Sequence, residues 1–291
     1  MWFAERWHVA LQPGALTVVQ RGRGARGGAP EHAECLPCPQ AAPGDAAWAP
    51  VLQALASWLA GRPRPPRVLH AVLSGHFVRW QLLPWSDALV RPDELAAYAA
   101  LRLREVYGAA ADAWQVAYAA PAPGQAVAAC GVDAALLARL RAVCAARGTR
   151  LQSVTPYAAA AFGHWRRALG RQTTYFGVLE PGLLLLGLQR GGQWRSLRSE
   201  RVPASGPRLA EALRRMQGQQ ALAAGLDERG LPLYLAGVQH GTHHGAQDAV
   251  QERGVHAPAL DGTVPASTWL APRWPVAAAS VPPAARMALG V

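Results

Sequence analysis

A short strand-turn-strand pattern occurs twice in this sequence of 291 residues. Its two copies are Leu11-Gln12-Pro13-Gly14-Ala15-Leu16, followed by Gln20-Arg21-Gly22, and Leu179-Glu180-Pro181-Gly182-Leu183-Leu184, followed by Gln189-Arg190-Gly191. The Pro-Gly pairs of the two copies lie 168 positions apart, which is the length of a domain rather than of a solenoid repeat. The repeat therefore predicts two related α/β lobes, each opening with a hairpin.

The basic residues of the chain are all arginine: none of the 29 is lysine, and the formal net charge is +11. A phosphate-binding loop of the Gly-rich, Lys-Ser/Thr kind needs a lysine ammonium, so this class is excluded, as is Schiff-base chemistry. The arginines are scattered singly rather than in blocks, and we do not expect nucleic acid to be a partner. A basic nucleic-acid-binding protein stays open as an alternative because of the charge alone.

The start of the chain, Met1-Trp2-Phe3-Ala4-Glu5-Arg6-Trp7-His8, lacks the basic and apolar regions of a secretory signal. No uninterrupted apolar stretch is long enough to span a bilayer; the best one, Pro181 to Leu188, is far too short. We therefore expect a cytoplasmic protein without a membrane span of its own.

Two clusters have residue types that bind metals. Cys35-Leu36-Pro37-Cys38 has the spacing of a zinc knuckle or a redox pair, but no second close pair accompanies it, so we expect a reduced pair in a loop. His240-Gly241-Thr242-His243-His244 has no carboxylate or cysteine at ligand spacing, and a solvated loop is expected. We predict no metal site and no catalytic residue.

The apolar periodicity and the Gly and Pro positions predict alternating strands and helices. Strands are expected at 9–11, 16–20, 67–73, 77–83, 114–119, 126–131, 151–154 (buried), 174–179, 183–189, 194–202 and 231–236. Helices are expected at 46–59, 93–107, 134–146, 207–223 and 247–253, with another following 151–154. In the helix at 93–107 the apolar face is expected to consist of Leu95, Tyr98, Leu101, Leu103 and Val106.

The order of these elements resembles the actin-like family of type IV pilus assembly proteins, the PilM-like branch, and its relative, the cytoplasmic domain of the type II secretion L protein. The resemblance rests on Val72-Leu73-Ser74-Gly75-His76-Phe77-Val78, Leu83-Pro84-Trp85, Asp93-Glu94-Leu95, Trp114-Gln115-Val116-Ala117-Tyr118, the segment from Val127 to Asp133, and the segment from Gly148 to Pro156. It covers about Trp7 to Gly241, and it lies in the pattern of elements along the chain rather than in a diagnostic motif.

The resemblance implies a duplicated actin-like (ribonuclease H-like) α/β fold with two lobes and an inserted small subdomain. We expect the first lobe at 1–168, with the inserted subdomain at about 66–132, and the second lobe at 169–256. A Pro- and Ala-rich tail, partly irregular, is expected at 257–291.

In this family both hairpins face a nucleotide bound between the lobes, and the first hairpin usually carries an acid, an apolar residue and a glycine for magnesium and phosphate. The matching positions here are Ala10, Leu11 and Gln12 in the first copy and Val178, Leu179 and Glu180 in the second. Ala236-Gly237-Val238 retains one glycine of the family's later Gly-Gly pair. The resemblance thus places a degenerate nucleotide cleft at Gln12, Pro13, Gly14, Glu180, Pro181, Gly182 and Gly237. ATP and magnesium are possible ligands but are not expected.

The function implied is a cytoplasmic scaffold of a type IV pilus or type II secretion-like machine, associated with the inner membrane through a partner. Such proteins receive an extended peptide of a membrane-anchored component in a groove of the inserted subdomain, here expected between Leu69 and Val132, and a homo-oligomer is possible. An active ATPase or phosphotransferase stays open as an alternative, with the acid supplied by Asp227, Glu228 or Asp261.

Ser74-Gly75-His76 and Glu180 each allow a structural and a catalytic interpretation. Ser74-Gly75-His76 places a hydroxyl near an imidazole, but no third orienting acid can be named, so a turn is expected rather than a nucleophile with its base. Glu180 has no paired carboxylate, so it is expected to be a polar turn residue rather than an acid or base in a cleft.

Overall fold

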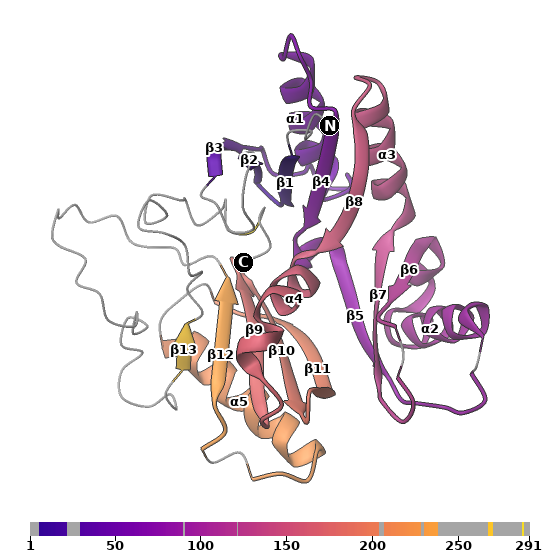
Figure 1. Ribbon diagram of the computed structural model, residues 1–291, viewed down its shortest axis with the longest axis vertical. Helices are drawn as coiled ribbons and strands as arrows, with labels where there is room; N and C mark the ends of the chain where they lie inside the picture. Colours follow the sequence, from indigo (N-terminus) through magenta and orange to yellow (C-terminus); the bar gives the residue numbers. More distant parts are fainter. Residues whose placement is uncertain are drawn as a thin grey trace, which may run out of the picture.

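The computed structural model describes residues 6–21, 30–89, 91–120, 122–203, 207–227, 230–237 and 267–269, together with Met287. The strands of this part form two five-stranded sheets and one three-stranded sheet. Figure 1 shows the first large sheet at the top, the second at the bottom and the small sheet at the right.

The first large sheet has the strand order β3-β2-β1-β4-β8. Its strands are β1 (Arg6–Gln12), β2 (Ala15–Arg21), β3 (Pro30–Pro37), β4 (Val68–Leu73) and β8 (Arg150–Pro156). Strand β2 runs antiparallel to its neighbours β1 and β3, whereas β4 runs parallel to its neighbours β1 and β8. This sheet forms the first lobe.

The second large sheet repeats this order and these directions as β11-β10-β9-β12-β13. Its strands are β9 (Thr174–Glu180), β10 (Leu183–Arg190), β11 (Gln193–Arg201), β12 (Leu233–Gly237) and β13 (Ser267–Trp269). Both ends of β9 lie 168 positions after those of β1, the spacing of the repeated pattern. The predicted duplication is therefore confirmed at the level of sheet topology.

Both hairpins turn through Pro-Gly. Gln12 pairs with Ala15, and Glu180 pairs with Leu183, so each loop has two residues. Gly14 and Gly182 have φ angles of 83° and 78°. A Pro-Gly turn needs this positive φ at its second position, and glycine adopts it without steric cost.

The helices cover the large sheets. They are α1 (Ala49–Ala60), α3 (Ala134–Ala145), α4 (Tyr157–Leu169) and α5 (Pro207–Ala223). Helices α1 and α3 form one core with Trp7, Val9 and Leu11 of β1, while α5 packs on the second sheet. Helix α4 lies in a core shared by both lobes, since its buried residues contact strands of each sheet.

The inserted subdomain is the sheet β5-β7-β6, covered on one face by α2. Its elements are β5 (Val78–Leu83), α2 (Pro92–Tyr107), β6 (Trp114–Tyr118) and β7 (Val127–Asp133), with short 3₁₀ turns η1 (Gly75–Phe77) and η2 (Gly108–Ala113). Because side chains alternate along a strand, Val127 and Ala129 face α2 and Ala128 and Cys130 face the other way. The second face of this sheet is therefore turned toward α4 and the second lobe.

Three predictions of local structure are wrong. The segment with Cys35 is not a loop but part of β3, because it pairs with β2 as a third antiparallel strand. Leu101 and Val106 of α2 are each 54% exposed, since Leu95, Ala99 and Leu103 form the face against the sheet. Strand β8 is only partly buried because it lies at the edge of its sheet.

The remaining predicted strands and helices within the described residues are confirmed, with shifts of a few residues at their ends. The predicted helix at 247–253 and His240, His243 and His244 lie outside the described residues, as does the tail except β13 and Met287. The exact domain boundaries stay predictions. None of the helices in the described part combines the length and apolar character needed to cross a bilayer.

Candidate functional site

The two lobes are joined by a buried carboxylate at the end of β9. Glu180 is 3% exposed, and its side chain extends from the second lobe to Ser74 and Gly75, which follow β4 of the first lobe. Ser74 is 1% exposed. The amide of Ser74 donates to the carbonyl of Leu11 at 3.0 Å, which connects this point to the end of β1.

Each oxygen of the Glu180 carboxylate accepts a hydrogen bond from the first lobe. The Ser74 hydroxyl donates to Oε2 at 2.5 Å, and the Gly75 amide donates to Oε1 at 2.7 Å. A Cβ at position 75 would lie 2.8 Å from Glu180 Oε1 and 2.8 Å from Leu183 Cδ2. Only glycine lets the backbone approach the carboxylate this closely.

Burial raises the pKa of Glu180 above its usual value, because desolvation disfavours the charged carboxylate. The hydrogen bonds from Ser74 and Gly75 act in the opposite direction, but burial is the larger effect. The prediction of a simple polar turn residue for Glu180 is therefore wrong: the side chain is buried in the contact between the lobes.

His76 takes part in the same contact but not in a proton relay. Its Nε2 lies 2.9 Å from the carbonyl oxygen of Pro181, while its amide donates to the Ser74 hydroxyl oxygen at 3.2 Å. Burial is the main cause of a lowered pKa for His76. Because the imidazole points to Pro181 and not to Ser74, the geometry does not activate the serine as a nucleophile.

The remaining predicted cleft residues are structural in this arrangement. Gln12 is buried at the end of β1, and the carbonyl of Gly14 accepts from the Cys38 amide at 2.8 Å. The carbonyl of Gly182 accepts from the Val202 amide at 3.2 Å. A Cβ on Gly237 would lie 2.0 Å from the carbonyl oxygen of Leu179, so the glycine permits β12 to end against β9.

The chemistry of this contact does not fit a nucleotide with magnesium. A phosphate needs hydrogen-bond donors, and here the Ser74 hydroxyl and the Gly75 amide are both taken by the carboxylate of Glu180. Within the described residues no group of three or more His, Cys, Asp or Glu side chains could hold a metal ion.

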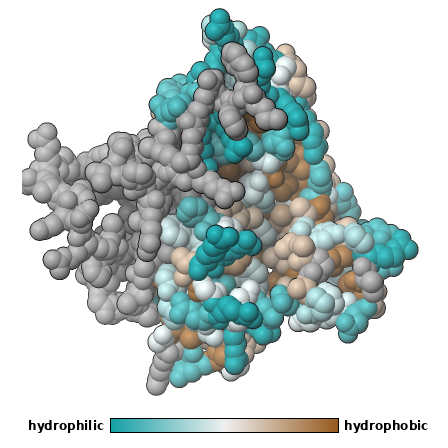
Figure 2. Space-filling model, in the orientation of Figure 1, coloured by the Kyte–Doolittle hydropathy of each residue, from teal (hydrophilic) through white to brown (hydrophobic). Residues whose placement is uncertain are grey.

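A groove of about 390 Å³ lies where the inserted subdomain, α4 and the second lobe meet. Its walls are mainly apolar: Trp80, Ala128 and Cys130 from the subdomain, Phe162 and Gly163 from α4, and Phe176, Leu185, Trp194 and Leu197 from the second lobe. Arg166 lies at the last turn of α4 on the same lining. In Figure 2 apolar residues reach the surface between the upper lobe and the subdomain at the right.

Of the walls of this groove, only the subdomain wall lies within 69–132, the range where a peptide groove is expected from the sequence. The helix wall and the second-lobe wall come from residues that lie up to 117 positions away, from Trp80 to Leu197. Phe162 packs on Phe176 and on Trp194, with ring centroids 5.7 Å and 4.5 Å apart. No spacing along the chain indicates that these aromatic residues share one surface.

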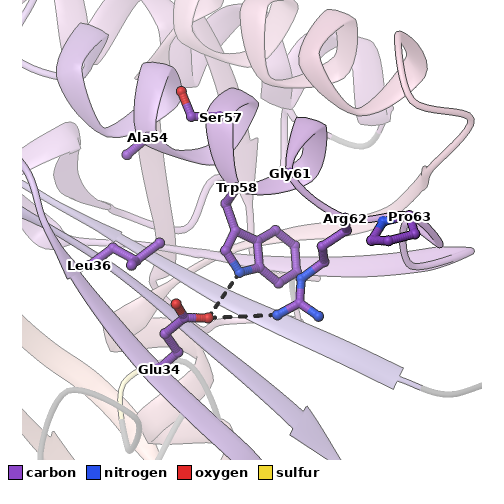
Figure 3. Close-up of a pocket in the computed structure, with 8 residues that line it drawn as sticks. All are labelled: Glu34, Leu36, Ala54, Ser57, Trp58, Gly61, Arg62 and Pro63. Atoms are coloured by element: carbon purple, nitrogen blue, oxygen red, sulfur yellow. Dashed lines mark hydrogen bonds and ion pairs between the residues drawn. The ribbon is translucent and has the colours of Figure 1, made fainter.

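A second hollow, of about 630 Å³, lies between α1 and β3 (Figure 3). The Arg62 guanidinium stacks over the rings of Trp58 and Trp7, 4.2 Å and 4.7 Å from their centroids. The Trp58 indole donates to Glu34 at 3.1 Å, and Arg62 pairs with Glu34 at 3.6 Å. Because these polar groups already pair with one another, we assign no ligand to this hollow.

Comparison with known proteins identifies the fold. No protein-family model matches the chain, and no curated protein does. Solved structures do match over most of the chain: the cytoplasmic domain of EpsL from the type II secretion system of Vibrio cholerae has 11% identity, covers 80% of this chain and 82% of its own, and gives a TM-score of 0.50.

Two further structures match equally well. A Bacteroides thetaiotaomicron protein of unknown function with an actin-like ATPase fold has 9% identity, with 80% of this chain and 82% of that chain covered and a TM-score of 0.55. The PilM-PilN type IV pilus biogenesis complex has 16% identity, with 81% and 82% covered and a TM-score of 0.54. The chain therefore has the actin-like fold, as predicted.

Proposed function

We propose that this chain is a scaffold of a type IV pilus or type II secretion-like assembly machine, which holds an apolar peptide segment of a membrane-anchored partner without turning over ATP. The groove between the inserted subdomain, α4 and the second lobe carries the proposal. The fold shared with the PilM-PilN complex and the EpsL domain supports the choice of machine. A cytoplasmic location follows from the same proposal.

The groove suits an extended peptide because its walls are aromatic and aliphatic and its volume accommodates a few side chains. Phe162 and Trp194 pack against each other in its lining, with ring planes tilted by 47°, and would contact apolar anchors of the peptide. The groove widens the predicted site, which was limited to 69–132, to include α4 and the second lobe.

Nucleotide independence is supported by Glu180. The donors that a phosphate would need are bonded to an internal carboxylate, and opening the site would break two hydrogen bonds between the lobes. Each buried group left without a partner costs about 1–3 kcal/mol. Binding of a nucleotide at this contact would therefore be opposed by the folded state itself.

The proposal is tested by crosslinking from the groove in the native host. A photo-crosslinking amino acid is placed at Gly163, where a Cβ has no heavy atom within 4 Å and therefore enters open space beside the groove wall. The control carries it at Leu222, which is 83% exposed on α5. We expect position 163, and not position 222, to capture a cytoplasmic segment of a single-span membrane protein.

Two results would count against the scaffold. If positions 163 and 222 give the same crosslinks, the partner does not dock in the groove. A calorimetric titration with magnesium ATP is expected to show no binding, and tight magnesium-dependent binding would overturn nucleotide independence while leaving the docking site intact.

A further inference from the structure

Basic side chains face each other on the sheet of the first lobe, at the end away from Glu180. Arg6 of β1 pairs directly with Arg21 of β2, and His8 of β1 pairs directly with His70 of β4. The imidazoles of His8 and His70 are stacked, with centroids 4.9 Å apart and planes 16° apart. Direct cross-strand pairs of like charge destabilise a sheet, so the pairing of Arg6 with Arg21 has a cost in stability.

All four side chains lie on the same face of the sheet. Residues paired across neighbouring strands share a face, and side chains two positions apart along a strand do too, which links Arg6 to His8 and both to Arg21 and His70. Ser153 of β8 extends this row, since its Oγ lies 2.8 Å from His70 Nδ1. The result is a row of nitrogen and hydroxyl groups across four strands.

Two nitrogen atoms in this row have no hydrogen-bond partner in the described part of the chain. They are Nε2 of His8 and Nε of Arg21, both buried atoms. The indole nitrogen of Trp165 on α4 is also without a partner, and this residue is 8% exposed and packs in the same core as Ala10 and Val19. Buried donors without partners are rare in native proteins and cost free energy.

Among the described residues, the charged groups that shift the pKa values in this row are all basic. The pKa of His8 is lowered to about 3, first by burial and then by His70, Arg21 and Arg6. Burial and Arg6 lower the pKa of Arg21, and burial with both arginines lowers that of His70. On α4, His164 likewise has its pKa lowered by burial and Arg21. No acidic neighbour is among these causes.

We infer that Arg6, His8, Arg21 and His70, with Ser153 beside them, form an anion site that takes a phosphate group. A tetrahedral anion offers several acceptors at once, which suits two arginines, two imidazoles and a hydroxyl that lie in a row on one face. The site is reachable because Arg6 and His164 are exposed and the other side chains are partly exposed. It is separate from the groove and from Glu180, so it does not depend on the proposed function.

The phosphate group has two possible sources, an anionic lipid headgroup or a soluble phosphate compound. The first measurement is thermal unfolding in inorganic phosphate against chloride at equal ionic strength. The test variant is Arg6→Gln/Arg21→Gln, and the matched control is Arg195→Gln/Arg198→Gln, which removes the same charge from exposed positions on β11. We expect phosphate to stabilise the wild type and the control, and the test variant to lose about tenfold or more in apparent affinity.

The test variant has a second signature. Because it removes a like-charge pair, we expect it to be more stable than the wild type in chloride while failing to respond to phosphate. Should it not fold, Arg6→Gln alone replaces it, since Arg6 is exposed, and histidine NMR resonances of the wild type report whether phosphate reaches His8 and His70.

Sedimentation with phosphatidylglycerol and phosphatidylcholine vesicles separates the sources. Binding to phosphatidylglycerol that is lost in the test variant and kept in the control assigns the phosphate to a lipid headgroup. A response to inorganic phosphate without vesicle binding assigns it to a soluble compound. Equal behaviour of wild type, test variant and control in both measurements would overturn the site.

Discussion

The hydroxyl of Ser74 donates a hydrogen bond to the carboxylate of Glu180 at 2.5 Å, across 106 positions of the chain. This bond joins the end of β4 in the first lobe to the end of β9 in the second, so it fixes how the two lobes meet. The resemblance to the actin-like family implies a nucleotide cleft between the lobes. Here an internal carboxylate accepts hydrogen bonds from the Ser74 hydroxyl and the Gly75 amide. Two measurable predictions concern this contact, and two others concern Gly163 and His8.

The first prediction concerns the pH dependence of stability through Glu180. Its pKa is raised above 4.5 by burial, so the folded state holds this proton more tightly than the unfolded state. The free energy of unfolding should therefore decrease as pH rises from about 4.5 through the raised pKa, by up to about 1.4 kcal/mol per pH unit. Urea denaturation at a series of pH values measures this component, and Glu180→Gln should lack it.

The variant Ser74→Ala tests the same pH dependence by removing a hydrogen bond to the Glu180 carboxyl. The Ser74 hydrogen bond lowers the pKa of the carboxyl, so its removal should raise that pKa further and move the pH-dependent loss of stability to higher pH. If Glu180→Gln and the wild type show the same pH dependence, the carboxyl is not buried as described.

The second prediction concerns Gly75. A methyl group there would meet Glu180 Oε1 and Leu183 Cδ2 at 2.8 Å, so Gly75→Ala should destabilise the protein by about 1–3 kcal/mol through overpacking. Denaturant unfolding of Gly75→Ala, Glu180→Ala and the double variant gives a double-mutant cycle. We expect the double variant to be more stable than the sum of the single losses implies, and strict additivity would show that the two residues do not touch.

The third prediction concerns Gly163 in the helix wall of the groove. A Cβ there meets no heavy atom within 4 Å, so Gly163→Ala should stabilise the protein by up to about 1 kcal/mol through helix propensity. Gly163→Leu should fold equally well but fill part of the groove, and partner capture from a second groove position, Leu197, should fall in this variant alone. Partner capture that is equal in both variants would place the partner elsewhere.

The fourth prediction concerns His8, whose pKa is about 3 in the folded state against 6.5 ordinarily. The folded state binds fewer protons than the unfolded state between these values, so the contribution of His8 to stability is lost as pH falls from 6.5 toward 3. His8→Phe should lack this loss and be less sensitive to acid than the wild type. An NMR titration that finds His8 protonating near 6.5 would contradict the prediction.

The effects of Glu180 and His8 have opposite signs within an overlapping pH range. Protonation of Glu180 favours the folded state, whereas protonation of His8 disfavours it. The wild-type profile alone therefore shows only their difference, and the two variants Glu180→Gln and His8→Phe are needed to separate them.

Local patterns in the sequence accounted for most of the fold. The two Pro-Gly hairpins were predictable because Pro and Gly determine the turn, and α5 was predicted with the bounds it has, 207–223. The buried face of α2 was not predicted correctly. Leu101 is more apolar than Ala99, but Leu101 is exposed and Ala99 is buried. Which face of a helix is buried depends on its packing partner, and a small residue such as Ala99 permits the closest approach.

The sequence by itself determined the duplication and the order of strands and helices. Through the resemblance, it also determined that the acid and glycine expected for a nucleotide site are missing. Each of these conclusions depends on short patterns of neighbouring residues. Only the tertiary structure decided that Glu180 reaches Ser74, that Trp80, Phe162 and Trp194 line one groove, and that His8 stacks on His70. The physical reason is that such contacts join residues far apart in the chain. Their formation depends on how sheets and lobes pack together, and no local periodicity encodes that packing.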